Sequence, residues 1–184
     1  MRIGFLLVLF CLSATTVLAQ DSEEADTLIG NDFDNGWVAA FDDKLSTVDG
    51  DFANFAGVHG GWLIDHSFLL GGAVYGATNS PFGFDIAYGG VLVEYFFNPN
   101  KVVNYSVRGV IGGGGFGHFD DHNHRGRNEV KGFFIAEPEA RVTLNVLKPF
   151  RIGFGLGYRF VGGDSSRLDL SGPTFAFSFK FGSF

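Results

Sequence analysis

Residues 150–160 read Phe-Arg-Ile-Gly-Phe-Gly-Leu-Gly-Tyr-Arg-Phe, so bulky apolar residues alternate with glycine or arginine without a break. Successive side chains of a β-strand point to opposite faces, and this period of two predicts a strand with one apolar face and one small or charged face. Residues 172–184 repeat the pattern, with Phe at every second position from 175 to 181. In residues 132–147 the apolar positions alternate with two glutamates, an arginine, a threonine and an asparagine.

The same alternation runs from Trp37 to the end of the chain, and no segment there keeps a helical period of 3.6. Eight segments are predicted to be strands: residues 37–48, 51–64, 67–78, 84–97, 102–118, 132–147, 150–162 and 172–184. Each is long enough to cross a bilayer as a tilted strand, which needs about 9 to 11 residues. The sequence therefore predicts an all-β fold.

The connections between these strands differ in length in a regular way. Residues 65–66, 98–100 and 148–149 form tight turns, whereas 79–83, 119–131 and 163–171 form longer polar loops, and 49–50 is the short exception on the loop side. Short turns at one end, long loops at the other and an even strand number are typical of bacterial outer-membrane barrels. We therefore expect an eight-stranded antiparallel up-and-down transmembrane β-barrel over residues 37–184, with both termini on the periplasmic side.

The aromatic face of these strands is expected to meet lipid. Four Phe on the last strand and three on its neighbour would overfill the narrow interior of an eight-stranded barrel. Phe52 and Trp62 share a face ten residues apart. At ~3.3 Å per residue and a tilt of about 40°, that spacing projects to roughly 25 Å, the height of the apolar band of an outer-membrane barrel.

Four residues complicate the strand assignments. Pro138 lies inside a predicted strand and cannot donate a ladder hydrogen bond, so we expect a β-bulge there. Asp43 and Glu94 leave open which faces of the first and fourth strands point inward. Phe184 is out of step with the alternating Phe before it, so the last residues are expected to curl at the membrane surface.

In its pattern, though not residue by residue, the segment 37–184 resembles the small bacterial outer-membrane β-barrels of the OmpX and OmpA transmembrane-domain families. The most specific feature is the C-terminal stretch Phe-Ala-Phe-Ser-Phe-Lys-Phe-Gly-Ser-Phe, residues 175–184. It resembles the alternating aromatic signal that the barrel assembly machinery recognises in such proteins. The resemblance implies contact with outer-membrane lipid and with that machinery through the strand ending at Phe184.

The N-terminal region has the features of an export signal. Arg2 is followed by an apolar run over residues 3–12, and Val-Leu-Ala at 17–19 precedes Gln20, which predicts a signal peptide over residues 1–19 that is cleaved on export. Phe10 before Cys11 is too bulky for lipoprotein processing. Residues 20–36 are acidic and rich in turn-forming residues, and they are expected to be a flexible leader. The predicted location is the bacterial outer membrane.

Charge and composition exclude several classes of function. The chain carries 13 Lys or Arg against 20 Asp or Glu, a formal charge of −7, which disfavours general electrostatic attraction to nucleic acid or to anionic lipid. Removal of residues 1–19 takes away the single Cys and the single Met, so the exported chain has no thiol chemistry and no disulfide. The sequence indicates no cofactor.

The charged residues of the non-aromatic faces form one candidate site. An eight-stranded barrel is just wide enough for side chains to fill it, and buried charges there must pair. We expect an interior charge network that plugs the barrel, with a gated pore or a proton relay as alternatives. Its predicted members are Lys44, Glu94, Arg108, Glu137, Glu139, Arg141, Arg151 and Arg159.

The loop at 119–131 holds the second candidate site. Imidazole and carboxylate groups are suitable ligands for divalent metal ions, although no second cluster fixes a geometry here. These weak metal candidates are His118, Asp120, Asp121, His122 and His124. An acyl-chain enzyme would need a Ser and a His within hydrogen-bond reach, and Ser80 or Ser165 with His118 or His122 have no supporting motif. The glycine-rich residues 112–117 lack the Lys-Ser/Thr of a phosphate-binding loop.

The sequence as a whole predicts a non-enzymatic outer-membrane barrel with a closed interior. Its expected role is structural, or is a contact with an extracellular ligand or protein through the loop 119–131. The alternatives are a narrow channel for small solutes, an outer-membrane enzyme that modifies lipid A, and a soluble lipocalin-like barrel.

Overall fold

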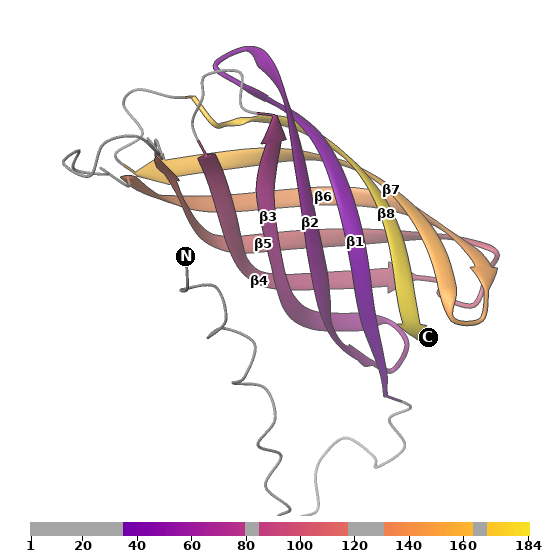
Figure 1. Cartoon of the computed structure of the whole chain (residues 1–184). Helices are drawn as coiled ribbons and strands as arrows, with labels where there is room; N and C mark the ends of the chain where they lie inside the picture. Colours follow the sequence, from indigo (N-terminus) through magenta and orange to yellow (C-terminus); the bar gives the residue numbers. More distant parts are fainter. Residues whose placement is uncertain (1–34, 80–84, 118–130, 164–168) are drawn as a thin grey trace, which may run out of the picture. The chain divides into compact units, whose positions relative to one another are not determined.

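The computed structural model describes residues 35–79, 85–117, 131–163 and 169–184, which form a closed barrel of eight strands (Figure 1). Each strand pairs antiparallel with the next, and β8 pairs with β1. The strands are β1 (Gly36–Val48), β2 (Asp51–Ile64), β3 (Phe68–Asn79), β4 (Asp85–Phe97), β5 (Val103–Gly117), β6 (Lys131–Leu147), β7 (Phe150–Gly163) and β8 (Gly172–Ser183). The predicted all-β, eight-stranded antiparallel fold is confirmed, and every strand boundary falls within one residue of its predicted position.

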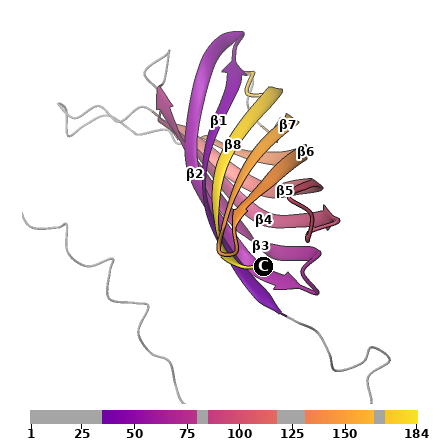
Figure 2. The ribbon, with the colours of Figure 1, turned by 90° about the vertical axis from the view of Figure 1, so that its right-hand side faces the viewer.

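Short turns gather at one end of the barrel. The β2–β3 turn has Asp65 and His66 at φ of 50° and 49°, the two positive angles that a two-residue hairpin turn requires. Asn98, at φ of 53°, begins the β4–β5 turn, and residues 148–149 join β6 to β7. The strand β1 starts and β8 ends at this same end, which we call the tight-turn end. Figure 2 shows that the strands, which form the wall, are strongly tilted.

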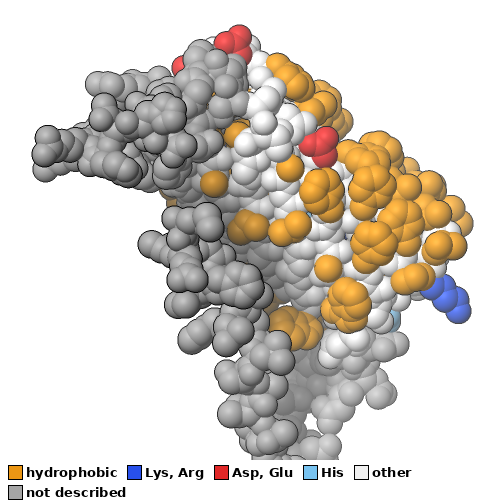
Figure 3. Space-filling view, in the orientation of Figure 1, with side chains coloured by type: hydrophobic (Ala, Val, Ile, Leu, Met, Phe, Trp, Pro, Cys, Tyr) orange, Lys and Arg blue, Asp and Glu red, His pale blue; other side chains and the backbone are white. Residues whose placement is uncertain are grey.

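The barrel has apolar residues outside and charged residues inside. On β7, Phe154, Leu156 and Phe160 are 57%, 59% and 54% exposed, whereas Arg151 and Arg159 are 6% and 1% exposed. The other strands follow the same alternation of buried and exposed positions. Figure 3 shows the apolar side chains gathered on the outer wall. Among the described residues, no helix is both long and apolar enough to cross a membrane.

The structure settles the two open strand assignments. On β1, Asp42 and Lys44 are fully buried inside the barrel, and Asp43 points outward, where the side chain of Asn54 donates a hydrogen bond to it at 2.8 Å. On β4, Glu94 points inward and is fully buried. Two consecutive acidic residues on β1 therefore occupy opposite faces, as the period of two requires.

The predicted bulge at Pro138 is wrong. The register of β6 is the same on both sides of Pro138, and the ladder to β7 omits only the pairs at positions 137 and 138. Pro138 remains paired with Gly109 of β5, so its missing N–H is accommodated on the β7 side without an extra residue. The register shifts instead at Asn145/Leu147 between β6 and β7, and at Asn54/Phe55 between β2 and β3.

The inner wall contains glycines where strands approach closely. Gly90 of β4 pairs with Gly112 of β5, and a Cβ placed on Gly90 would overlap the carbonyl oxygen of Ile111. Gly109, on the outer face of β5, has open space around the same position. A side chain at residue 90 would therefore push two neighbouring strands apart.

We expect Gly90→Ala to lower the free energy of unfolding by about 1 to 3 kcal/mol because of this overlap. Gly109→Ala is the matched control, and it should be neutral or slightly stabilising, by ~0.4 to 1 kcal/mol. Urea unfolding of the protein in detergent micelles, followed by tryptophan fluorescence, measures both changes. Equal losses of stability for the two variants would show that the close approach of β4 and β5 is not a packing constraint.

Candidate functional site

The interior of the barrel concentrates the buried charges of the described residues. Four carboxylates and six Lys or Arg side chains are at most 6% exposed there, together with one histidine. They come from seven strands, because every strand but β3 presents at least one Lys, Arg, His, Asp or Glu on its inward face. These residues are Asp42, Lys44, His59, Glu94, Arg108, Glu137, Glu139, Arg141, Arg151, Arg159 and Lys180. We call this set the interior charge cluster.

Glu139 of β6 is the centre of the cluster. Its carboxylate lies 2.8 Å from the Lys44 ammonium, 2.8 Å from the Arg108 guanidinium and 3.0 Å from the Arg141 guanidinium. These cations come from β1, β5 and β6, so one carboxylate joins three strands. Glu137 adds a second bridge, since it pairs with Lys44 and lies 3.7 Å from Arg159 of β7.

Asp42 of β1 accepts several hydrogen bonds at one oxygen. Its Oδ2 receives the Tyr75 hydroxyl at 2.7 Å, lies 2.8 Å from His59 Nδ1 and is 3.2 Å from the Arg108 guanidinium. Charge-assisted hydrogen bonds of this kind are about twice as strong as neutral ones. The Tyr88 hydroxyl similarly donates to Glu137 at 3.1 Å. Tyr75 therefore brings a polar group into the cluster from β3, and Tyr88 adds one from β4, the strand that also carries Glu94.

Apolar layers close the cluster on both sides. Toward the loop end, Phe55 and Tyr88 stack edge to face, with ring centroids 5.7 Å apart, and the Arg159 guanidinium lies 4.4 Å from the Phe55 ring centre. Toward the tight-turn end, the Lys180 ammonium lies 4.8 Å from the Phe96 ring. The other buried apolar side chains of these layers include Val38, Leu63, Leu69, Leu92, Phe116, Phe133, Ile135 and Leu170. The charged middle of the barrel is thus enclosed by packed side chains.

One further ion pair lies on the tight-turn side of the central carboxylates. The Lys180 ammonium of β8 lies 2.7 Å from Glu94 Oε1 of β4, which also accepts a hydrogen bond from Ser106 at 2.6 Å. Both charged side chains are fully buried. Arg151 of β7 lies beside this pair in the β7–β8 ladder, opposite Lys180, but it takes part in no ion pair with any residue that the structure describes.

All eight residues predicted for the interior network lie inside the barrel. Seven of them form ion pairs, and Arg151 instead stacks on the Phe184 ring. The Phe184 ring thus covers an inward side chain at the tight-turn end. The sequence showed that Phe184 breaks the alternation of the preceding Phe residues, but not that it contacts Arg151. The sequence reasoning missed Asp42, His59 and Lys180 as members of the cluster. It also missed Tyr75 and Tyr88, whose hydroxyls donate to the cluster's carboxylates.

The metal candidates His118, Asp120, Asp121, His122 and His124 lie outside the described residues, as does nearly all of the loop 119–131. Ser80 and Ser165 lie outside them too. Within the four described ranges, no group of three or more His, Cys, Asp or Glu is arranged to hold a metal ion.

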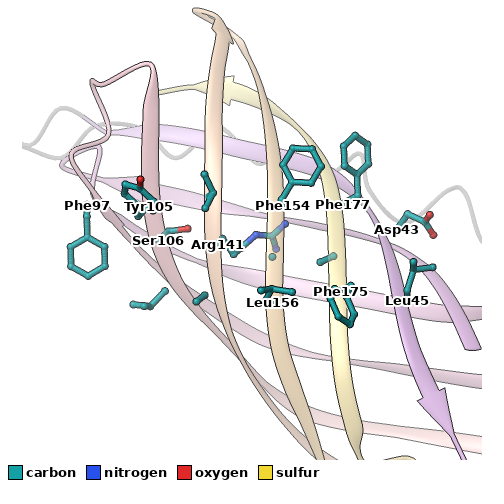
Figure 4. A pocket seen from close by; sticks show the side chains of 15 residues that line it. Asp43, Leu45, Phe97, Tyr105, Ser106, Arg141, Phe154, Leu156, Phe175 and Phe177 are labelled. Atoms are coloured by element: carbon teal, nitrogen blue, oxygen red, sulfur yellow. The ribbon is translucent and has the colours of Figure 1, made fainter. Parts of the chain in front are cut away.

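The outer wall carries an apolar groove of about 670 Å³ that runs from the end of β4 across β5 to β8 and onto β1 (Figure 4). Phe154 and Phe177 line one side, and Leu156 and Phe175 line the other. Asp43 lies at one end, and the lining residues that the structure describes include no histidine. Among the described residues, the groove therefore brings together no Ser–His pair of the kind that cleaves acyl chains.

No family model matches the chain, and no curated protein matches it in sequence. Several solved structures share its fold. The N-terminal β-barrel domain of Pseudomonas aeruginosa OprF is 10% identical with a TM-score of 0.57, covering 79% of this chain and 96% of that domain. Neisserial surface protein A is 12% identical with a TM-score of 0.57, covering 82% of this chain and 97% of its own. The Yersinia pestis attachment invasion locus protein Ail, crystallised with the heparin analogue sucrose octasulfate, is 12% identical with a TM-score of 0.53, covering 82% and 98%.

These similarities establish the fold. The chain has the architecture of the eight-stranded outer-membrane barrels, which confirms the class predicted from its resemblance to the OmpX and OmpA families. Identities of 10–12% carry no residue roles from those proteins to this one.

The Glu94–Lys180 pair allows a test of the ion-pair network. Glu94→Gln leaves the Lys180 charge buried without a partner, and Lys180→Met leaves the Glu94 charge in the same condition. We expect each single variant to lower the free energy of unfolding by about 3 to 5 kcal/mol. The double variant removes both charges, so it should lose less stability than the sum of the two single changes. Urea unfolding in detergent micelles measures the cycle, and strictly additive losses would show that the two residues do not interact.

Proposed function

We propose that this protein is an integral outer-membrane barrel with a closed interior, acting as a structural element or surface contact of the bacterial envelope. The observation that carries this proposal is the inverted polarity of the barrel, with exposed aromatic residues outside and a sealed charge cluster inside. A barrel in water would expose the charges and bury the aromatic rings. A barrel in lipid requires the arrangement seen here.

The positions of the aromatic residues support a membrane setting. Trp37 of β1 and Trp62 of β2 pair near the tight-turn end and are 55% and 74% exposed, while Phe52 lies at the loop end of the same wall. Amphipathic aromatic rings are enriched at the two interfaces of a bilayer. The large apolar side chains between them supply the surface that lipid chains would cover.

The closed interior favours a structural or contact role over conduction. A path through the barrel would require Glu139 to leave three cations, and removing one partner from a buried ion pair is strongly unfavourable. The partners we propose are therefore outer-membrane lipid along the wall and an extracellular ligand or protein at the loop 119–131. We further propose that the barrel assembly machinery recognises β8, whose sequence carries the alternating Phe positions.

Gel mobility and conductance together test this proposal. The full chain folded in detergent micelles should migrate as a compact species when unboiled and more slowly after boiling, because a closed barrel resists the detergent sodium dodecyl sulfate. The same sample added to a planar bilayer should give no stable conductance steps, since the interior is filled. Solubility of the folded protein without detergent would exclude the membrane setting. Stable conductance would exclude the closed interior and favour the narrow pore.

The lipid-facing wall can be tested by one substitution at mid-height. Phe154→Arg should lower the free energy of unfolding in lipid vesicles by about 2 to 4 kcal/mol if residue 154 lies near the midplane. Phe97→Arg is the matched control, because Phe97 ends β4 at the tight-turn end, where the same change should cost about 0 to 1 kcal/mol. Equal tolerance of Arg at the two positions would contradict the proposed orientation of the wall.

A further inference from the structure

The charges inside the barrel do not balance. Six buried Lys or Arg side chains face four buried carboxylates, so positive charge is in excess among the described interior residues. Each carboxylate lies within ion-pair distance of at least one Lys or Arg. Burying an unpaired charge costs several kcal/mol, so an uncompensated cation calls for a counter-charge from elsewhere.

Arg151 is one of the two cations in excess, and it is the one that lies apart from the carboxylates. This residue begins the inward face of β7, is 6% exposed, and has no carboxylate of the described chain within ion-pair distance. Its Nη1 is buried and has no hydrogen-bond partner. The Phe184 ring covers one face of its guanidinium, with the ring centre 3.7 Å from the guanidinium carbon. Stacking on a ring fixes the plane of a guanidinium and leaves its edge free to donate.

A pocket of about 640 Å³ opens beside this guanidinium at the tight-turn end. Lys148, in the β6–β7 turn, brings a second cation to its lining. The pocket has a fixed wall, because the Asn145 side chain donates to the Pro99 carbonyl at 2.9 Å and to the Lys101 carbonyl at 2.7 Å. Pro99, Asn145 and Phe184 line the pocket together with these two cations.

We propose that this pocket binds a phosphate-type oxyanion through Arg151 and Lys148. The edge of a guanidinium matches two oxygens of a phosphate group in a bidentate arrangement, and a nearby ammonium adds attraction without fixing a direction. The bound anion compensates the charge that the interior carboxylates leave uncompensated. Its source is either a free phosphate or the headgroup of a phospholipid at that end of the barrel. The inference goes beyond the proposed function, since binding of a free anion does not depend on a membrane role.

The test uses the full chain labelled with ¹⁵N in a non-ionic detergent that carries no phosphate. Inorganic phosphate is titrated in one arm and short-chain dihexanoyl phosphatidylglycerol in the other, and the Nε–H resonance of Arg151 reports binding. We expect a saturable shift of this resonance in at least one arm. Saturation by inorganic phosphate identifies a free-anion site, and saturation only by the phospholipid identifies a headgroup site.

Three variants separate a specific site from general attraction to positive charge. Arg151→Gln should weaken binding at least about tenfold, and Arg151→Lys should weaken it less, because it keeps the charge but loses the bidentate edge. Binding to these two variants is followed through the backbone amide resonances of residues 145–151. Lys101→Gln is the matched control, since it removes an exposed charge at the same end but does not line the pocket.

Unchanged affinity in Arg151→Gln, or equal weakening by Lys101→Gln, would overturn the proposal, as would the absence of any saturable shift in both arms. If Arg151→Gln fails to fold, Lys148→Gln takes its place, because Lys148 lies in a turn outside the buried cluster. Its affinity should fall several-fold, and an unchanged affinity would equally overturn the proposal.

Discussion

Two ion pairs cross the barrel from wall to wall, and the cross-section of the molecule depends on them. Asp42 of β1 meets Arg108 of β5, and Glu94 of β4 meets Lys180 of β8. In a ring of eight strands these are diametrically opposite partners. Ladder hydrogen bonds join only neighbouring strands, so they close the ring without fixing its shape. The charged side chains supply the contacts across it.

The small residues on the inner face follow from this arrangement. Gly155 of β7 faces the cluster, and a Cβ there would lie 3.3 Å from the Arg141 side chain and 3.3 Å from Glu139. Arg141 pairs with Gly155 in the β6–β7 ladder, so the glycine leaves room for the long charged side chains of the neighbouring strand. The alternation of glycine with Phe and Leu in residues 150–160 therefore reflects two requirements at once, a small inner face and a bulky outer face. This explains why that one stretch predicts the polarity of the whole barrel.

The sequence predicted the strands well because one physical rule, the period of two, determines both their extent and their faces. It predicted the members of the charge cluster less completely, and the reasons are local. Asp42, Asp43 and Lys44 are consecutive charges that interrupt the alternation of apolar and polar residues, and only Lys44 was predicted to point inward, although Asp42 shares its face. His59 lies among glycines, where neither face has a pattern. Tyr75 and Tyr88 occupy positions that read as apolar, and only the folded barrel shows that their hydroxyls reach Asp42 and Glu137. Which side chains meet across the interior depends on the stagger between strands. That stagger is set when the sheet closes into a barrel, and no single segment of the sequence determines it.

The filled interior also gives the two ends of the barrel different chemistry. Toward the loop end, buried aromatic and aliphatic side chains cover the charge cluster, and the cations beneath them have carboxylate partners. Toward the tight-turn end, Arg151 lies against Phe184 at the edge of a pocket, and no carboxylate in the described parts of the chain neutralises it. Moving an ion through the middle would break several buried pairs at once, whereas an anion that reaches Arg151 breaks none. Binding an anion at the tight-turn end therefore requires less free energy than moving an ion through the interior.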